Sequence, residues 1–587
     1  MANITTRKIP ADAYEILSAH GLPSVLARIF AARGIAHPSQ LETTFSRMAS
    51  FEQLKNSKQI AVLLADAIAA QKRLLVIADY DTDGATACAV ALRALRQFGA
   101  MVEYLVPNRF EYGYGLTPEI VRLAADRMPS PDILITVDNG IASVEGVEEA
   151  NRLGMQVFIT DHHLPGDRLP DAAVIVNPNQ PGCPFPDKHI AGVGVIFYVM
   201  LALRAELRER DAFAAAGKEP NLASLLDLVA LGTVADVVRL EGTNRILVQQ
   251  GLQRIRNGFC CAGIHALFKA AGRDFRRAAA YEMGFILAPR LNAAGRLDDM
   301  SLGIECLLTD DESRALRLAG ELDELNRQRR EIESGMRDEA MDKLGGVIDS
   351  LNLPDTPANN DGQSVYSLCL YDSGWHQGVI GLIASRVKDR LHRPVIVFAR
   401  GGDGEIKGSG RSILSLHLRD ALDLVAKRCP GLIIKFGGHA MAAGLTIHEQ
   451  DFELFRTAFE QVAQSLLTPA DLIQVIETDG MLEEADLTLE LAQYLSDQVW
   501  GQGFPEPSFN GCFRVENQRI VGEKHLKLKL RKAGTAQVYD GILFFCAERL
   551  PAEIDAVYRV QVNEYNGSTR MQLLLEHWFA SGQAQYG

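Results

Sequence analysis

The strongest constraint on the fold is a repeated alternation of strand-like and helix-like segments between about residues 72 and 176. The strand-like runs are RLLVIA, VEYLVP, DILITV, MQVFIT and AAVIVN, and helical stretches such as ATACAVALRALRQFG lie between them. This alternation predicts βαβ units on a parallel sheet. Ligands of such sheets bind just beyond the carboxyl ends of the strands, so the residues that follow each run are the candidates for a functional site.

The remaining sequence divides into regions with their own patterns, and the whole chain is predicted to be of the α/β class. Residues 1–60 are expected to form a helical N-terminal segment before a parallel-sheet domain over 61–308. Apolar residues at helical spacing predict a long connecting helix over 309–352. A linker rich in Pro, Asn and Asp follows, then a smaller α/β domain over 363–467. Short strands over 468–587 predict an OB-like β-barrel.

One segment of the expected barrel has a strict period-two pattern. Leu526, Leu528 and Leu530 alternate with basic residues at the positions after them, which are Lys527, Lys529 and Arg531. A strand with this pattern has one apolar and one basic face. We expect the basic face to contact nucleic acid, and the barrel to contribute affinity more than chemistry.

The composition is typical of a cytoplasmic globular protein. Of 587 residues, 47% are hydrophobic and 23% charged, and the longest apolar stretch, 190–203, is too short to span a membrane. The start of the chain lacks the apolar core of a signal peptide. Nine cysteines without a C-x-x-C pair indicate neither a disulfide framework nor a cysteine zinc site. The net charge of −14 argues against general coating of nucleic acid, but it allows a local basic groove.

Metal-ligating side chains follow three of the strand-like runs and one later apolar run. They are Asp79, Asp81 and Asp83, then Asp138, then His162 and His163, and finally Asp236. Carboxylates gathered at one edge repel one another unless a cation lies between them. A single Asp would more simply cap a helix. An EF-hand is excluded, because Val90 stands where its twelfth-position Glu would be.

The ligand types indicate which ion the site would hold. Carboxylate oxygens suit Mg²⁺ or Mn²⁺, and the imidazoles favour Mn²⁺. This many carboxylates can hold two ions, an arrangement that activates water and stabilises an in-line displacement at phosphorus. The predicted chemistry is therefore hydrolysis of a phosphoester.

The motifs resemble those of the DHH phosphoesterase superfamily. DYDTDG, VDNG, DHH and the segment containing ADV are similar to its four motifs. The segments PNRF, HIAGVG, PRLNAAGR, GWHQGVIG, SGRS and GGHAMAAG are similar to segments of its bacterial single-strand-specific 5′→3′ exonucleases. The second α/β domain resembles DHHA1, and GFPEP resembles the region leading into the C-terminal barrel of those exonucleases. The resemblance covers nearly the whole chain.

The resemblance implies a set of metal ligands: Asp81, Asp83, Asp138, His162 and Asp236. It places Asp79 and His163 in or next to the site, so that the candidate catalytic residues are Asp79, Asp81, Asp138 and His163. Several superfamily members have a His before the first aspartates, whereas this chain has Ile77 and Ala78. The ligands of the second ion are therefore left open.

Candidate substrate-binding residues come from the same motifs. The resemblance implies that Arg109, Arg290, Ser409 and Arg411 hold the terminal phosphate or the scissile region, because Arg and glycine-rich turns bind phosphates. Asn292, Arg296 and His439 lie in these motifs as well. Tyr114 is a candidate stacking surface for an unpaired base, although an aromatic residue in a glycine-rich loop can equally cover the core.

The resemblance implies a metal-dependent 5′→3′ exonuclease that degrades single-stranded DNA to 5′-mononucleotides in recombination and repair. It further implies a monomer that works beside a helicase and a single-strand-binding protein, without a membrane. One alternative is a DHH phosphodiesterase for short oligoribonucleotides or cyclic dinucleotides, which would not need the basic-faced barrel. Another is a non-catalytic replication scaffold, which would have lost ligands that this chain retains.

Overall fold

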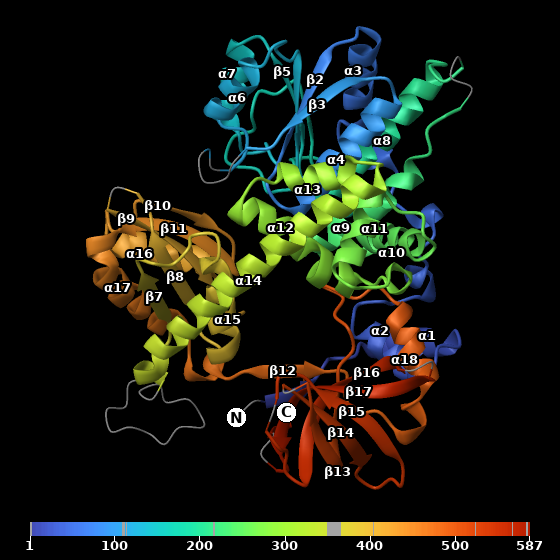
Figure 1. Cartoon of the computed structure of the whole chain (residues 1–587), viewed down its shortest axis with the longest axis vertical. Helices are drawn as coiled ribbons and strands as arrows, with labels where there is room; N and C mark the ends of the chain where they lie inside the picture. Colours follow the sequence, from blue (N-terminus) through green and yellow to red (C-terminus); the bar gives the residue numbers. More distant parts are fainter. Residues whose placement is uncertain are drawn as a thin grey trace. The chain divides into compact units, whose positions relative to one another are not determined.

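The computed structural model describes residues 3–107, 112, 114–214, 218–348, 365–402, 404–522, 524–546, 548–565, 568–582 and 585–586 (Figure 1). The chain forms two compact units, each described here by itself. The first unit contains Ile9–Asn326 and Glu490–Pro507, and the second contains Met1–Lys8, Arg327–Leu489 and Ser508–Gly587. Among the described helices, none is both long and apolar enough to cross a membrane.

The first unit is built on the predicted parallel sheet, three of whose strands, β2, β3 and β5, are labelled in Figure 1. The strand order of the sheet is β3-β2-β4-β5-β6. Its strands are β2 (Arg73–Ala78), β3 (Met101–Leu105), β4 (Ile133–Val137), β5 (Gln156–Thr160) and β6 (Val174–Val176). All neighbouring strands pair in parallel, which confirms the prediction. Strand β3 lies on one side of β2 and β4 on the other. The strand order therefore reverses between β2 and β4, and such a switch point is where α/β sheets bind ligands.

Helices cover both faces of this sheet. Helices α6 (Pro118–Ala125) and α7 (Val144–Arg152) share one apolar core with β2, β4 and β5. Helices α3 (Ser57–Ala69), α4 (Thr82–Gln97) and α8 (Gly192–Glu209) pack together and contact the sheet. Because both faces are covered, the strands β2, β4, β5 and β6 are almost continuously apolar, and only the first residues of β2 and β5 are exposed. The edge strand β3 is more exposed, at Met101 and Glu103.

The rest of the first unit is helical (Figure 1). It contains α1 (Ala11–Ala19), α2 (Ser24–Ala31), α9 (Leu226–Ala235), α10 (Gly242–Arg256), α11 (Ala262–Ala270), α12 (Ala288–Leu297), α13 (Ser301–Leu308) and α18 (Leu489–Asp497). Helix α18 follows the second unit in the sequence, yet from Glu490 onward it belongs to the first. The expected connecting helix is α14 (Glu312–Ile348), and the boundary between the units lies within it.

The second unit contains the smaller α/β domain. Its sheet has the order β10-β11-β9-β8-β7, in which only β7 and β8 are parallel. The strands are β7 (Leu368–Asp372), β8 (Val395–Arg400), β9 (Glu405–Arg411), β10 (Lys435–Gly438) and β11 (Ala442–His448). Helix α15 (Ile380–Leu391) shares a core with β7 and β8, and α16 (Leu418–Arg428) and α17 (Phe452–Leu466) share another with the sheet.

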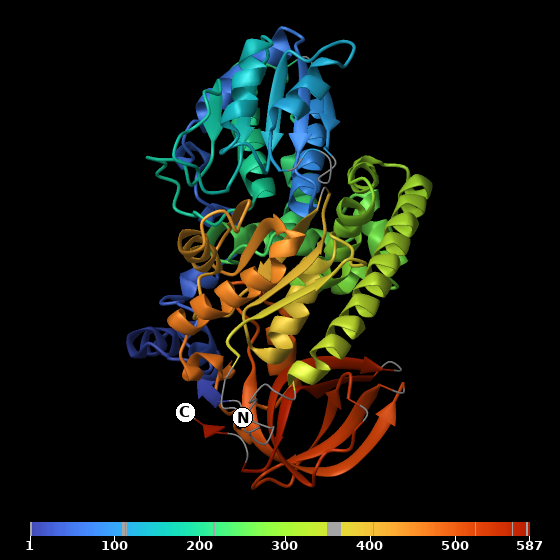
Figure 2. The same cartoon turned by 90° about the vertical axis from the view of Figure 1, so that its left-hand side faces the viewer.

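The second unit also contains the predicted barrel, drawn in red in Figure 2. It is closed in the order β13-β14-β15-β17-β16. The strands are β13 (Phe509–Val521), β14 (His525–Lys532), β15 (Val538–Leu543), β16 (Glu553–Tyr565) and β17 (Ser568–Ala580). A separate small sheet joins β12 (Val475–Thr478), β1 (Asn3–Thr6) and β18 (Gln585–Tyr586). The N-terminal segment thus begins with a strand before its helices.

Candidate metal centre and nucleic-acid interface

The predicted metal-ligating side chains come together at the carboxyl ends of β2, β4 and β5 and at the end of α9. Their ligand atoms form three overlapping groups whose members lie within 4.8 Å of one another: Asp79, Asp81 and Asp138; Asp83, His162 and Asp236; and Asp138, His162 and His163. The first two strands in this set, β2 and β4, flank the switch point of the sheet. The position of the cluster therefore follows from the strand order.

Backbone donors fix two of the aspartates. Asp81 is the N-cap residue of α4, and its side chain accepts a hydrogen bond from the Gly84 N–H at 3.0 Å. Asp83, in the first turn of the same helix, accepts hydrogen bonds from the N–H groups of Gly192 and Val193 at 2.7 and 2.9 Å. These donors begin α8, whose dipole favours a negative charge there. The same turn can therefore cap α4 through Asp81 and supply Asp81 and Asp83 as predicted metal ligands.

Three buried atoms face one another at the centre of the cluster. His162 Nε2 lies 3.1 Å from Asp138 Oδ1 and 3.5 Å from Asp236 Oδ2, and none of the three has a hydrogen-bond partner among the described residues. The His162 ring bonds the backbone of Ile190, so its Nδ1 carries the proton. Burial and the nearby charge of His163 lower the pKa of His162 to about 4. A neutral imidazole therefore presents its lone pair beside two carboxylates.

The carboxylates themselves repel one another. Burial, and then the charge of Asp81, raises the pKa of Asp83 to about 7. Burial and the neighbouring aspartates also raise the pKa values of Asp138 and Asp236 well above their usual range. A divalent cation among these groups would offset that repulsion and satisfy the buried atoms without partners. The donor set of carboxylates and imidazole fits Mn²⁺ or Mg²⁺.

Asp161 also contributes to the structure of this site, and the sequence analysis assigns it no role. It is 1% exposed, and its Oδ1 accepts hydrogen bonds from the backbone N–H groups of His162 and His163. The same oxygen lies 2.8 Å from His163 Nδ1. Burial alone would lower the pKa of His163, but the hydrogen bond to Asp161 and the nearby aspartates raise it to about 9. His163 is therefore a cation, and Tyr114 Oη lies 3.2 Å from its Nε2. In the sequence, Asp161 could have been recognised as the first residue of the DHH motif.

Two predicted substrate-binding residues of α12 make internal contacts. Arg290 is buried, with its guanidinium 2.8 Å from Asp323. Asn292 Oδ1 accepts hydrogen bonds from the N–H and hydroxyl of Thr82, at 2.9 and 2.8 Å, and so supports the turn that carries Asp81 and Asp83. Arg296 is half-buried near the end of the same helix. Arg109 lies outside the described residues. The phosphate-binding roles of these residues stay predictions.

The other predicted substrate-binding residues lie in the second unit. Arg411 ends β9, and its guanidinium donates hydrogen bonds to the Gly410 carbonyl at 2.8 Å and to Ser409 Oγ at 3.3 Å. Burial lowers the pKa of Arg411. Within the described part of the chain, no carboxylate pairs with this guanidinium, so it can bind an anion. His439 follows β10 and is exposed.

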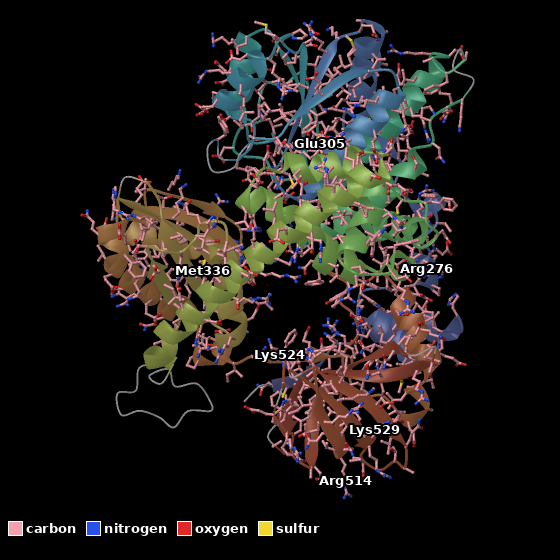
Figure 3. All side chains as sticks on the ribbon, in the orientation of Figure 1. Arg276, Glu305, Met336, Arg514, Lys524 and Lys529 are labelled. Carbon is pink, nitrogen blue, oxygen red and sulfur yellow. The ribbon has the colours of Figure 1, made fainter. Side chains whose placement is uncertain are left out.

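Two of the three residues of the basic face predicted for the barrel form ion pairs. Lys529 forms an ion pair with Asp540 at 2.8 Å, and Arg531 forms one with Glu516 at 2.8 Å. The acidic partners come from the neighbouring strands β15 and β13. Figure 3 shows Lys529 among the side chains of this barrel. These two residues therefore do not present free positive charge.

The free positive charge of this face lies nearer the other end of β14. Lys527 is the cross-strand partner of Arg519, and neither pairs with a carboxylate in the described structure. Beside them, the ring of His525 contacts Phe544 and Phe545 at centroid distances of 5.1 and 5.3 Å. Phe545 is 86% exposed. We call these five residues the aromatic–basic patch. Like charges directly opposite one another on paired strands are unfavourable unless an anion binds them.

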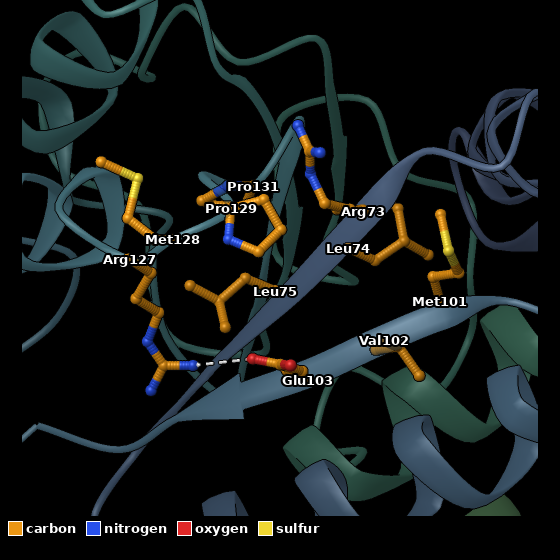
Figure 4. Close-up of a pocket in the computed structure, with 10 residues that line it drawn as sticks. All are labelled: Arg73, Leu74, Leu75, Met101, Val102, Glu103, Arg127, Met128, Pro129 and Pro131. Atoms are coloured by element: carbon orange, nitrogen blue, oxygen red, sulfur yellow. Dashed lines mark hydrogen bonds and ion pairs between the residues drawn. The ribbon is translucent and has the colours of Figure 1, made fainter.

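A pocket of about 500 Å³ lies elsewhere on the first unit, at the amino ends of β2 and β3 (Figure 4). An ion pair of 3.3 Å joins Arg127 to Glu103 there. The pocket is also lined by Arg73, Leu74, Leu75, Met101, Val102, Met128, Pro129 and Pro131. It lies at the strand ends opposite those that carry the ligand cluster, and so it is not part of the candidate metal centre.

A parallel α/β sheet with a carboxylate–imidazole cluster at its switch point defines a DHH-type protein. Residues 73–233 match the DHH family N-terminal domain, 361–465 match the DHHA1 domain, and 478–577 match the RecJ OB domain. The chain belongs to the RecJ family.

Relatives and solved structures resemble the chain over nearly its whole length. It is 48% identical to the single-stranded-DNA-specific exonuclease RecJ of Dickeya dadantii, over 95% of this chain and 96% of that protein. It is 47% identical to the Escherichia coli protein of the same name, with the same coverage. The crystal structure of Thermus thermophilus RecJ in complex with Mn²⁺ covers 99% of this chain, with 80% of that chain matched, a TM-score of 0.81 and 28% identity.

Proposed function

We propose that this chain is a metal-dependent exonuclease that hydrolyses single-stranded DNA from the 5′ end and releases 5′-mononucleotides. The observation that carries the proposal is the buried cluster in which His162, Asp138 and Asp236 present ligand atoms without partners among the described residues. The relatives named above are single-strand-specific exonucleases, which supports the same substrate here. Bound divalent ions, two in this proposal, would supply charge neutralisation for an in-line displacement at phosphorus.

The protein's own residues prepare the site for that displacement. Hydrogen bonds from the start of α8 orient the Asp83 carboxylate, and the bond to Ile190 fixes the His162 tautomer. Asp161 holds the protonated His163 ring at the edge of the cluster. We assign to His163 a hydrogen bond to a phosphate oxygen of the substrate, since it is a cation beside a site that receives a polyanion.

Two alternatives share this metal centre. A phosphodiesterase for short oligoribonucleotides or cyclic dinucleotides needs no extended binding surface, whereas this chain carries a barrel with the aromatic–basic patch. A non-catalytic scaffold needs no ligands, whereas the cluster here is complete for the predicted set. Both observations favour the exonuclease.

A comparison of substrates tests the proposal. Purified protein with Mn²⁺ is expected to degrade single-stranded DNA, and to leave duplex DNA, short oligoribonucleotides and cyclic dinucleotides largely intact. Excess chelator should abolish the reaction, and added Mn²⁺ or Mg²⁺ should restore it, because the carboxylates alone cannot neutralise charge at phosphorus. Undiminished hydrolysis in chelator, or faster hydrolysis of the short RNA, would contradict the proposal.

We also propose a cellular setting on the strength of family resemblance. The enzyme would act in the cytoplasm as a monomer, in DNA recombination and repair. A nuclease restricted to single strands needs another protein to separate a duplex, and it meets strands that are covered by binding protein. A helicase and a single-strand-binding protein are therefore the proposed partners.

The aromatic–basic patch is the proposed contact of the barrel with DNA. Exposed aromatic rings stack on bases without regard to sequence, and cations beside them bind the phosphates. The logarithm of the single-strand binding constant falls linearly with the logarithm of the salt concentration. Lys527→Gln is expected to make this slope shallower by about 0.7, the value for one phosphate contact. Phe545→Ala should weaken binding by about 1–3 kcal/mol. Fluorescence anisotropy over a range of salt concentrations measures both effects.

Lys529→Gln is the matched control, because this lysine lies on the same strand but is paired with Asp540. Its salt slope should remain close to that of the wild type. A Lys529→Gln effect as large as that of Lys527→Gln would mean that the barrel binds DNA through its whole outer face instead.

A further inference from the structure

A short piece of late sequence is built into the first unit. Residues 490–507 belong to it, although the residues on both sides, 327–489 and 508–587, belong to the second unit. The first barrel strand, β13, begins two residues later at Phe509. We call residues 498–505 the anchor segment, because they make the contacts described next.

Aromatic rings and two arginines hold the anchor segment in place. Trp500 and Phe504 stack on each other at a centroid distance of 5.3 Å, and both stack against Phe30 of α2, at 6.0 and 6.3 Å. The Arg33 guanidinium lies over the Trp500 ring, and the Arg245 guanidinium lies 4.0 Å from the centre of the Phe504 ring. All of these residues belong to the first unit, so the segment is part of its packed structure.

The anchor segment contacts the loop that follows the predicted ligand Asp236. Leu240 donates a backbone hydrogen bond to the Gln502 carbonyl at 2.8 Å, and its side chain is buried. A Cβ at Gly501 would lie 2.6 Å from Leu240 Cδ1, so only glycine fits without movement. Between Asp236 and Leu240, Val237 has φ +63° and is 64% exposed. A β-branched residue rarely adopts this conformation, so neighbouring contacts must hold the loop in it.

A second connection leads from the same loop to His162. The Asn244 side chain is buried and donates hydrogen bonds to the Arg239 carbonyl at 3.0 Å and the His189 carbonyl at 2.7 Å. The residue after His189 is Ile190, whose backbone bonds the His162 ring. The loop fixed by the anchor segment is therefore tied to two of the predicted ligands.

We propose that the anchor segment is a positioning element of the metal centre: through Leu240 and Asn244 it sets the positions of Asp236 and His162. The inference rests on the proposed function only in taking this cluster as the metal centre. It changes one expectation from the sequence, which was that the region after residue 468 contributes affinity more than chemistry. A chain ending near Leu467 would lack the anchor segment, and it should bind metal poorly as well as DNA.

Gly501→Ala in the full-length protein tests this role. The new Cβ should displace Leu240 and weaken Mn²⁺ binding about 10-fold, within the 10- to 100-fold range seen when groups that orient metal ligands are changed. Calorimetry of Mn²⁺ binding measures this directly, without substrate. Hydrolysis should fall in parallel at low Mn²⁺ and recover at saturating Mn²⁺. The melting temperature in chelator should stay close to that of the wild type.

Gly320→Ala is the matched control, because this glycine is exposed on α14 with no atom near its would-be Cβ. Wild-type Mn²⁺ affinity in Gly501→Ala would overturn the inference, and so would a loss of affinity accompanied by an equal loss of stability in chelator. If Gly501→Ala does not fold, Phe504→Leu replaces it with the same expected and contradicting results. If the wild-type protein itself binds no Mn²⁺, the proposed function fails rather than the positioning role.

Discussion

Asp138→Asn is expected to abolish hydrolysis while making the metal-free protein more stable. The substitution removes a ligand that belongs to two of the three ligand groups, so kcat should fall by about 10³-fold or more, which corresponds to about 4 kcal/mol or more of transition-state stabilisation. It also removes a carboxyl group whose charged form is disfavoured by burial and by repulsion from Asp83, Asp81 and Asp236. Asn tolerates the left-handed backbone that Asp138 adopts, at φ +63°.

Two measurements separate these effects. Single-turnover hydrolysis at saturating Mn²⁺ reports the loss of rate, and urea unfolding in chelator should show a gain of about 1–2 kcal/mol. Asp126→Asn, a change at an exposed carboxylate after α6, should alter neither. A variant that retains activity, or that unfolds more readily than the wild type in chelator, would argue against a cation at this position.

Arg411→Ala is expected to remove most of the preference for a 5′-phosphate over a 5′-hydroxyl. A metal centre by itself does not distinguish strand direction, so direction requires a second, asymmetric contact. The partly buried Arg411 guanidinium has backbone and hydroxyl acceptors but no carboxylate among the described residues. Loss of a hydrogen bond to a charged group costs about 1–3 kcal/mol, so kcat/KM on 5′-phosphorylated strands should fall about 5- to 150-fold.

The comparison of kcat/KM on strands with the two end groups checks this prediction, with Mn²⁺ affinity measured alongside and expected to be unchanged. Arg419→Ala, at an exposed arginine of α16, is the control in the same domain. If Arg411→Ala still discriminates fully between the two end groups, the 5′-phosphate must be bound by other residues.

Arg290→Ala is expected to lose stability instead, since Arg290 is buried against Asp323.

The first domain could be predicted from the sequence because its signals are local. A strand covered by helices on both faces has to be apolar along nearly its whole length, and the parallel order brings the strand ends together. The predicted ligands Asp83, Asp138 and His162 could therefore be selected because they follow the strand-like runs in the sequence. Strands β9 and β11 of the second α/β domain are harder to predict from the sequence, because Gly408, Gly410 and Gly444 weaken the strand pattern.

Other features depend on contacts between residues far apart in the sequence. The ion pairs of Lys529 and Arg531 arise from strand register, which brings Asp540 and Glu516 beside them. The period-two pattern of one strand contains no information about those neighbours. The packing of Trp500 against α2 likewise joins residues separated by most of the chain. A division of the sequence into consecutive domains could not predict it.

End-labelled single strands test the central claim most directly. With Mn²⁺, a 5′-labelled strand should release its label at once as a mononucleotide, and a 3′-labelled strand should shorten stepwise through a ladder of intermediates. Neither product should form in excess chelator. Immediate release of the 3′ label with a ladder from the 5′-labelled strand, or a scatter of internal fragments from both, would contradict a metal-dependent exonuclease that starts at the 5′ end.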